Sequence, residues 1–210
     1  MSPPMREALK AVARALATVA VIPALCSFYV RSRVIGADRA LEGSTQALGL
    51  VPGLLGQYLR RAFLARTIAF CASSSVVEFG TIFSAVGAHL DVNVYIGARC
   101  HVGLAHFERD VLVAPAVHVP SGRLTHGIAD PDAPIRDQEG FRELVRIGAG
   151  SWIGSGAVVM ANVGCRTIIG AGAVVTRPLP DDVVAGGVPA RVLSVRPTPA
   201  LLEPNRARSR

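Results

Sequence analysis

Aliphatic residues recur every six positions through the second half of the chain, and this period constrains the fold more than any other feature. The clearest runs are VRIGAGSWIGSGAVV, from Val145 to Val159, and IIGAGAVVTRPLP, from Ile168 to Pro180. A period of six matches neither the helical repeat of 3.6 residues nor the strict alternation of a long strand. It is typical of a short strand followed by a corner, and three such units make one triangular coil.

The aliphatic residue that begins each unit is expected to point into the coil and to stack on the coil below. Aromatic residues make up only 5% of the chain, which favours a core of small aliphatic layers. The predicted fold class is therefore an all-β solenoid, a parallel β-helix of hexapeptide repeats over residues 76–195. The alternative is a Gly-rich sandwich with coincidental spacing. The expected inward residues are Leu90, Ile96, Val102, Phe107, Val113, Val119, Ile147, Ile153, Val159, Ile169 and Val175.

The repeat is interrupted between Val119 and Ile147 by a polar, charged stretch that includes THG and DPDAP. We expect residues 120–146 to form a loop extruded from a corner of the solenoid. Long loops on rigid scaffolds are where functional residues concentrate, so this loop is the first place to seek a site.

Residues 1–75 form an apolar, basic segment that is expected to be helical. One helix is predicted over residues 5–30, and a second within 44–70 that begins at Pro52. The apolar run from Ala15 to Val30 is shorter than the about 20 residues of a bilayer span. The segment is expected to cap the open end of the solenoid or to contact a membrane surface through residues 5–70, and the two roles are compatible.

The net charge of +7 favours anionic partners. The chain shows no nucleic-acid-binding module, so nucleic acid is not an expected partner. Four cysteines without a C-x-x-C pair are typical of reduced thiols in the cytoplasm. The expected location is cytoplasmic, with peripheral contact to the inner face of the membrane as an option. Residues 196–210 are expected to form a disordered basic tail.

Three motifs point to one family. The most specific is VVTRPLPDDVVAGGVPARVL, from Val174 to Leu193; the others are WIGS, from Trp152 to Ser155, and the histidine-bearing loop before it. With these motifs, residues 93–195 resemble the left-handed β-helix acyltransferases of the hexapeptide-repeat superfamily. The resemblance is strongest to sugar and polysaccharide O-acetyltransferases of the maltose, galactoside and colanic-acid type.

The resemblance implies a homotrimer whose active sites lie between subunits, with acetyl-CoA as the co-substrate and no metal. The implied acceptor is a hydroxyl of a sugar or of an exopolysaccharide precursor. The apolar, basic N-terminus adds a lipid-linked glycan to the candidate acceptors. Direct transfer from a thioester to a hydroxyl needs a general base, and histidine suits this task near neutral pH.

Four of the five histidines stand one place before an inward residue and should point outward. His101 and His118 are expected to stack on one face, and His89 and His106 on another. His126 alone lies in the extruded loop, where the resemblance places the catalytic histidine. His126 is therefore the expected base, and His118 is the second candidate.

The resemblance also assigns a set of CoA-binding residues. Ser155 and Ala171 should present their backbones to the pantetheine arm, and Trp152 should lie near the reacting end. Three further residues are expected toward the phosphorylated nucleotide end: Thr176, Arg177 and Arg191.

Two other functions remain open at this point. The chain could be a non-catalytic β-helix scaffold or assembly protein at a membrane. The spacing of His101 and His106 also resembles the γ-type zinc carbonic anhydrases, although the upstream third histidine is missing and the nearest candidate is His89. Zinc would need three convergent ligands and an open coordination position.

Overall fold

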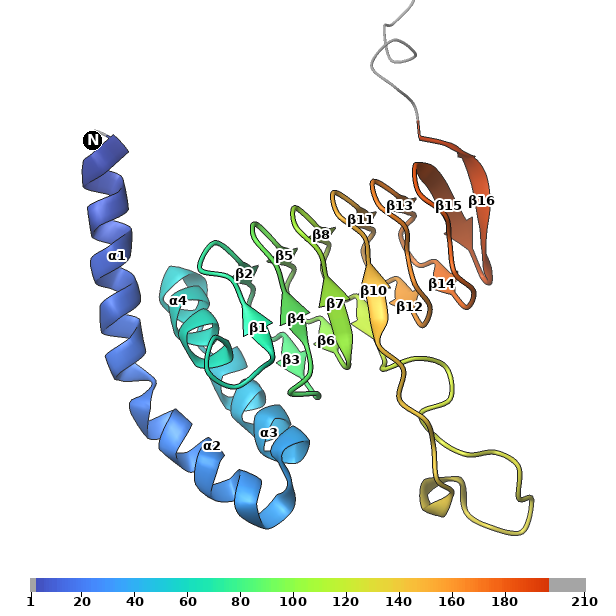
Figure 1. The fold of residues 1–210 in the computed structure, drawn as a ribbon, viewed down its shortest axis with the longest axis horizontal. Helices are drawn as coiled ribbons and strands as arrows, with labels where there is room; N and C mark the ends of the chain where they lie inside the picture. The colour runs from blue at the N-terminus through green and yellow to red at the C-terminus, as the bar shows by residue number, and fades with distance from the viewer. Residues whose placement is uncertain (1–2, 197–210) are drawn as a thin grey trace, which may run out of the picture.

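The computed structural model describes residues 3–196, which form four helices followed by a parallel β-helix (Figure 1). Beyond residue 196, the expected basic tail lies outside the described residues. Each of the first four coils of the β-helix has three short strands, one in each of three sheets that run along the solenoid. The helices are α1 (Pro3–Ala20), α2 (Ile22–Ile35), α3 (Ala37–Gly49) and α4 (Gly53–Leu64).

The prediction of one helix over residues 5–30 is wrong, because the chain breaks at Val21. Pro23 lies in the first turn of α2, where it needs no amide hydrogen bond; within a continuous helix its ring would clash with the carbonyl four residues earlier. Of the described helices, none alone is long and apolar enough to cross a bilayer, whereas α1 and α2 pass this test only as a pair bent by 46°.

The second predicted helix is present as α4, whereas α3 was not predicted as a helix of its own. Gly36 has a φ of 87°, a value that glycine adopts without strain, and it separates α2 from α3. Pro52 then precedes α4, which begins at Gly53 as the proline signal predicts.

The three sheets of the solenoid are named A, B and C. All of their strand pairs are parallel except β15–β16, which is antiparallel. Sheet A contains β1 (Phe70–Cys71), β4 (His89–Leu90), β7 (Ala105–Phe107) and β10 (Val145–Ile147). Sheet B contains β2 (Val76–Val77), β5 (Tyr95–Ile96), β8 (Leu112–Val113), β11 (Trp152–Ile153), β13 (Ile168–Ile169), β15 (Val183–Gly187) and β16 (Ala190–Val195). Sheet C contains β3 (Ile82–Phe83), β6 (His101–Val102), β9 (His118–Val119), β12 (Val158–Val159) and β14 (Val174–Val175).

Every residue expected to point inward is buried, with at most 1% of its surface exposed. The sequence therefore predicts the core of the solenoid correctly. In the last coils, single bridges at Val163 and Leu179 replace full strands of sheet A, which shortens the spacing there. The coils also stack closely at the corners: a Cβ on Gly154 would lie 2.6 Å from the amide nitrogen of Ala171, so only glycine is tolerated.

The helices pack against the first coil of the solenoid, α3 on β3 and α4 on β1 and β2. The buried Arg60 fixes this contact: its Nε donates to the Val77 carbonyl at 2.9 Å and its Nη1 to the Val51 carbonyl at 2.7 Å. The Phe83 amide donates to Thr45 Oγ1 at 3.1 Å, which ties α3 to β3. The helical segment is thus joined to the solenoid by buried hydrogen bonds as well as by apolar packing.

One long connection leaves the solenoid. It joins β9 of sheet C to β10 of sheet A, includes the short 3-10 helix η1 (Ile135–Asp137), and projects away from the coils (Figure 1). We call residues 120–144 the corner loop, because they leave the solenoid where sheet C turns into sheet A.

Candidate functional site

A groove of about 590 Å³ lies at the corner between sheets C and A. The two limbs of the corner loop form one wall through Arg123 and Glu143. The corners of two successive coils form the other wall, at residues 160–162 and 176–178. The full lining is Arg123, Glu143, Leu144, Val145, Met160, Ala161, Asn162, Thr176, Arg177 and Pro178.

Each wall of the groove carries one arginine, and the wall of Arg123 also carries the carboxylate of Glu143. Arg123 and Arg177 are exposed and Thr176 is half-buried. Guanidinium groups with a nearby hydroxyl suit phosphate oxygens, because they offer several charge-assisted hydrogen bonds. Two of the residues predicted at the nucleotide end of CoA, Thr176 and Arg177, therefore lie in this groove. Arg123 and Glu143 were not predicted, because their place depends on the path of the loop.

His126 lies exposed in the outgoing limb of the corner loop. The two limbs contact each other directly: the Phe141 amide donates to the Leu124 carbonyl at 2.6 Å, and the Glu143 amide to the Ser121 carbonyl at 2.9 Å. Farther along the loop, Asp130 Oδ1 accepts a hydrogen bond from the Asp132 amide at 2.9 Å. His126 is therefore on the same loop as Arg123 and Glu143, but it is not among the residues that line the groove.

His118 lies on β9, exposed on the outer face of sheet C. It pairs in register with His101, and their ring centroids are 6.3 Å apart in an edge-to-face arrangement. The Nε2 atom of His101 is buried and has no hydrogen-bond partner among the described residues. Burial lowers the pKa of His101 and the neighbouring His118 lowers it further, while Glu42 on α3 partly opposes the shift. The expected stacking of the two histidines is thus present.

The remaining predicted CoA residues lie elsewhere on the solenoid. Trp152 projects from sheet B, and Ser155 and Ala171 occupy the next corner, between sheets B and C; the Gly172 amide donates to the Ser155 carbonyl at 2.8 Å there. Arg191 is exposed on β16, where its Nη1 donates to the Ala190 carbonyl at 3.0 Å. Within a single chain, these four residues therefore lie apart from the groove.

The histidine pair that motivated the zinc alternative is divided between two faces. His101 is on sheet C, whereas His106 is on sheet A and lies beside His89, with 4.2 Å between the ring centroids.

No protein-family model matches the chain. Over 121 residues, it is 31% identical to the galactoside O-acetyltransferase of Lactococcus lactis subsp. lactis (strain IL1403), which covers 55% of this chain and 51% of the relative. Over 51 residues, 23% of this chain and 25% of the relative, it is 47% identical to the galactoside O-acetyltransferase of Escherichia coli (strain K12). The chain thus spans about half the length, or less, of these curated relatives.

Among solved structures, the chain is similar to a galactoside acetyltransferase in complex with coenzyme A. The TM-score is 0.54 at 21% identity, with 76% of this chain and 81% of that chain covered. At this identity the similarity concerns the fold. It confirms the predicted left-handed parallel β-helix preceded by a helical segment.

Proposed function

We infer that this chain, a member of the hexapeptide-repeat acyltransferases by sequence similarity and by fold, is a CoA-dependent O-acetyltransferase. The proposed reaction moves an acetyl group from acetyl-CoA to a hydroxyl of a sugar, or of a polysaccharide or lipid-linked glycan precursor. The main structural support is the groove at the corner between sheets C and A. There the loop that bears His126 borders a cationic wall that includes Thr176 and Arg177.

In the proposed mechanism, His126 is the general base. Its imidazole takes the proton from the acceptor hydroxyl while the oxygen attacks the thioester carbonyl carbon. Backbone N–H groups stabilise the resulting oxyanion. The intermediate then collapses, the carbon–sulfur bond breaks, and the imidazolium returns its proton to the leaving thiolate of CoA. No enzyme-bound nucleophile is needed if the site holds donor and acceptor together.

We assign donor binding to two groups of residues. Arg177 in the groove, with Thr176 beside it, and Arg191 on β16 would contact phosphates at the nucleotide end of CoA. The backbones at Ser155 and Ala171 would contact the pantetheine amides, and Trp152 would lie toward the reacting acetyl group. The groove, β16 and the corner of Ser155 and Ala171 are different places on one chain, so the proposal requires a second subunit to bring these residues together.

The outer face of sheet B supports a homotrimer. Its central residues Tyr95, Leu112 and Trp152 pair in register and expose 36%, 46% and 49% of their surfaces. Apolar residues continue this row at both ends, so the face is an unbroken apolar ladder. The ladder residues are Val76, Tyr95, Leu112, Trp152, Ile168 and Val184. We propose that copies of the chain cover this ladder. This packing would place the corner of Ser155 and Ala171 in one subunit against the corner loop of the next.

Light scattering and sedimentation test the assembly. The wild-type chain is expected to be a trimer at micromolar concentration. Leu112→Glu should dissociate it, because a carboxylate in the ladder would be buried without a partner. Val34→Glu, at an exposed apolar position of α2, is the matched control and should leave the trimer intact. A wild-type monomer would contradict the proposal.

We also propose that the helical segment contacts a membrane surface that contains anionic lipids. Along α1, exposed apolar residues alternate at spacings of three and four, which gives one continuous apolar stripe. A pocket of about 320 Å³ beside α1 is lined by the cations Lys10, Arg14 and Arg61. Apolar and cationic groups on neighbouring surfaces are typical of interfacial helices. The stripe residues are Met5, Leu9, Val12, Leu16 and Val19.

Vesicle sedimentation tests this contact. The chain is expected to bind vesicles that contain phosphatidylglycerol and to bind pure phosphatidylcholine weakly. Leu9→Glu and Arg14→Gln should each reduce binding, whereas Val92→Glu, at an exposed apolar corner of the solenoid, should not. Equal binding by wild type and Leu9→Glu would refute the contact through α1.

The activity is tested by measuring release of free thiol from acetyl-CoA in the presence of sugars and lipid-linked glycans. Thiol release that depends on one class of acceptor supports the proposal and identifies the acceptor. If no acceptor raises thiol release and the chain binds no CoA in calorimetry, the scaffold function becomes the better account.

A further inference from the structure

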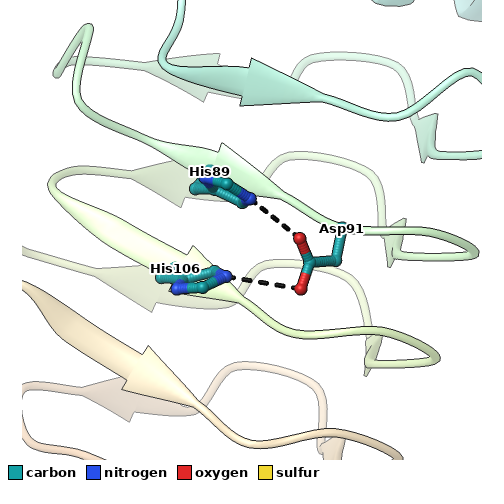
Figure 2. Close-up of side chains that lie close together, drawn as sticks. All are labelled: His89, Asp91 and His106. Carbon is teal, nitrogen blue, oxygen red and sulfur yellow. Dashed lines mark hydrogen bonds and ion pairs between the residues drawn. The ribbon is translucent and has the colours of Figure 1, made fainter.

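Two histidines and one aspartate converge on the outer face of sheet A (Figure 2). His89 on β4 and His106 on β7 are directly opposite each other in the register. Asp91 follows β4 and points to the same side, as alternate residues of an extended chain do. Figure 2 shows the two rings one above the other, with both Nε2 atoms turned toward the Asp91 carboxylate.

The three side chains are held close together by the coil. His89 Nε2 lies 2.8 Å from Asp91 Oδ1, and His106 Nε2 lies 3.4 Å from Asp91 Oδ2. The Asp91 backbone is fixed on both sides, because its amide donates to the Phe107 carbonyl at 3.0 Å and its carbonyl accepts from Ser75 Oγ at 2.8 Å. The carboxylate position is therefore set by two neighbouring coils.

These donor atoms have the spacing that a metal ion requires. One ligand atom from each residue lies within 4.8 Å of the others. Ligands of a tetrahedral Zn²⁺ at bond lengths of about 2.0–2.2 Å are about 3.3 Å apart, so small side-chain rotations bring all three onto one ion. The side chains of His89, Asp91 and His106 are 33%, 31% and 20% exposed. This exposure allows water to complete the coordination.

The next strands of sheet A, β1 and β10, place one residue on each side of the cluster. The ring of Phe70 packs against His89 on one side, with 4.8 Å between the ring centroids. On the other side the register places Arg146 next to His106. Arg146 is exposed, so its charge is largely solvated and opposes a bound cation only weakly.

We propose that His89, Asp91 and His106 form a binding site for one divalent transition-metal ion, with Zn²⁺ as the preferred ion. Two imidazoles and one carboxylate favour zinc and similar ions over Mg²⁺ or Ca²⁺, which prefer all-oxygen ligands. The ion would link two successive coils through residues to which the proposed acetyl transfer assigns no role. The site is therefore separate from the proposed function, and its test measures binding rather than turnover.

The test uses the full chain without a histidine tag, freed of metal by a chelator. Titration with Co²⁺ is expected to produce visible absorption bands that saturate at one ion per chain and disappear when Zn²⁺ is added. Asp91→Asn keeps the side-chain shape but removes the charge, and His106→Gln removes one nitrogen ligand. Each should weaken Co²⁺ binding by at least about tenfold, since even partners of metal ligands cost this much when mutated.

His118→Gln is the matched control, because His118 belongs to the other histidine pair, on sheet C. It should bind Co²⁺ like the wild type. Circular dichroism of each variant shows whether it is folded, and having two ligand variants keeps the test valid if one of them misfolds. The proposal is overturned if the wild type binds no Co²⁺, or if the two ligand variants bind Co²⁺ as tightly as His118→Gln does.

Discussion

Arg142 in the returning limb of the corner loop forms an ion pair with Asp38 at the start of α3, with 2.6 Å between Nη1 and Oδ2. The other carboxylate oxygen of Asp38 accepts a hydrogen bond from the Val86 amide at 2.9 Å. One carboxylate thus connects the loop, the helical segment and a corner of the first coil. The helical segment therefore helps to position the loop that bears His126.

We expect Arg142→Ala to affect turnover more than stability. The side chains of Arg142 and Asp38 are 56% and 36% exposed, and pairs of this kind contribute at most about 1 kcal/mol to the free energy of unfolding. Loss of the contact would free the loop, and a small displacement of a catalytic group lowers turnover by up to about 100-fold. Denaturant unfolding and thiol release measure the two effects. Arg136→Ala, in the same loop, is the control, and equal turnover in both variants would contradict this role.

His126→Ala should leave the oligomeric state and the CoA affinity unchanged, because the residue is exposed and makes no contact within the repeat. Turnover in the thiol-release assay should fall by about 10²–10⁴, the usual range for a positioned acid–base group. His118→Ala should reduce turnover less. If His118→Ala abolished turnover while His126→Ala retained most of it, the base would be His118 instead.

Arg191→Ala should weaken CoA binding and leave the fold intact. A charge-assisted contact with a phosphate contributes roughly 1.5–3 kcal/mol, so calorimetry should show a loss of affinity of about 10-fold or more. Arg109→Ala, at an exposed arginine of another coil, should bind CoA like the wild type. Unchanged CoA affinity in Arg191→Ala would remove Arg191 from the donor site.

The half-buried His101 should make stability depend on pH. Burial lowers its pKa, so the folded chain takes up this proton less readily than the unfolded chain does. The free energy of unfolding should therefore fall as the pH drops below about 6.5, the ordinary histidine pKa. At higher pH His101 is neutral in both the folded and the unfolded chain, so it should not change the free energy of unfolding. Glu42 opposes the effect and His118 adds to it, so the wild type must be compared with His101→Gln.

Denaturant unfolding at pH 7.5 and at pH 5.5 gives that comparison. The loss of stability between the two pH values should be smaller in His101→Gln than in the wild type. Equal losses would mean that other groups account for the pH dependence.

The parts of the fold that follow from local sequence were predictable. The six-residue period predicts the burial of Val113 and Ile153, because each coil repeats the same local geometry. The helical segment was harder, because its breaks depend on single residues. Pro23 was visible within the apolar run, yet the run alone suggested one helix, and Gly36 gave no periodic signal at all.

The site was predictable only in part, because its geometry depends on contacts between distant residues. Thr176 and Arg177 were identified through a motif, and the structure brings both to the groove. Arg123 and Glu143 join them only through the path of the corner loop, and Arg142 meets a partner 104 residues away. Asp91 was overlooked although it stands two places after His89, a spacing that puts both side chains on one face of a strand.

The helices on the first coil also restrict how the molecule can grow. A solenoid of parallel strands ends in unpaired backbone groups, which are templates for end-to-end polymerisation into fibrils. Here α3 lies over β3, and α4 lies over β1 and β2, so all three sheets are shielded at that end. Removing the helical segment should therefore convert a discrete protein into an aggregating one, whatever its effect on catalysis.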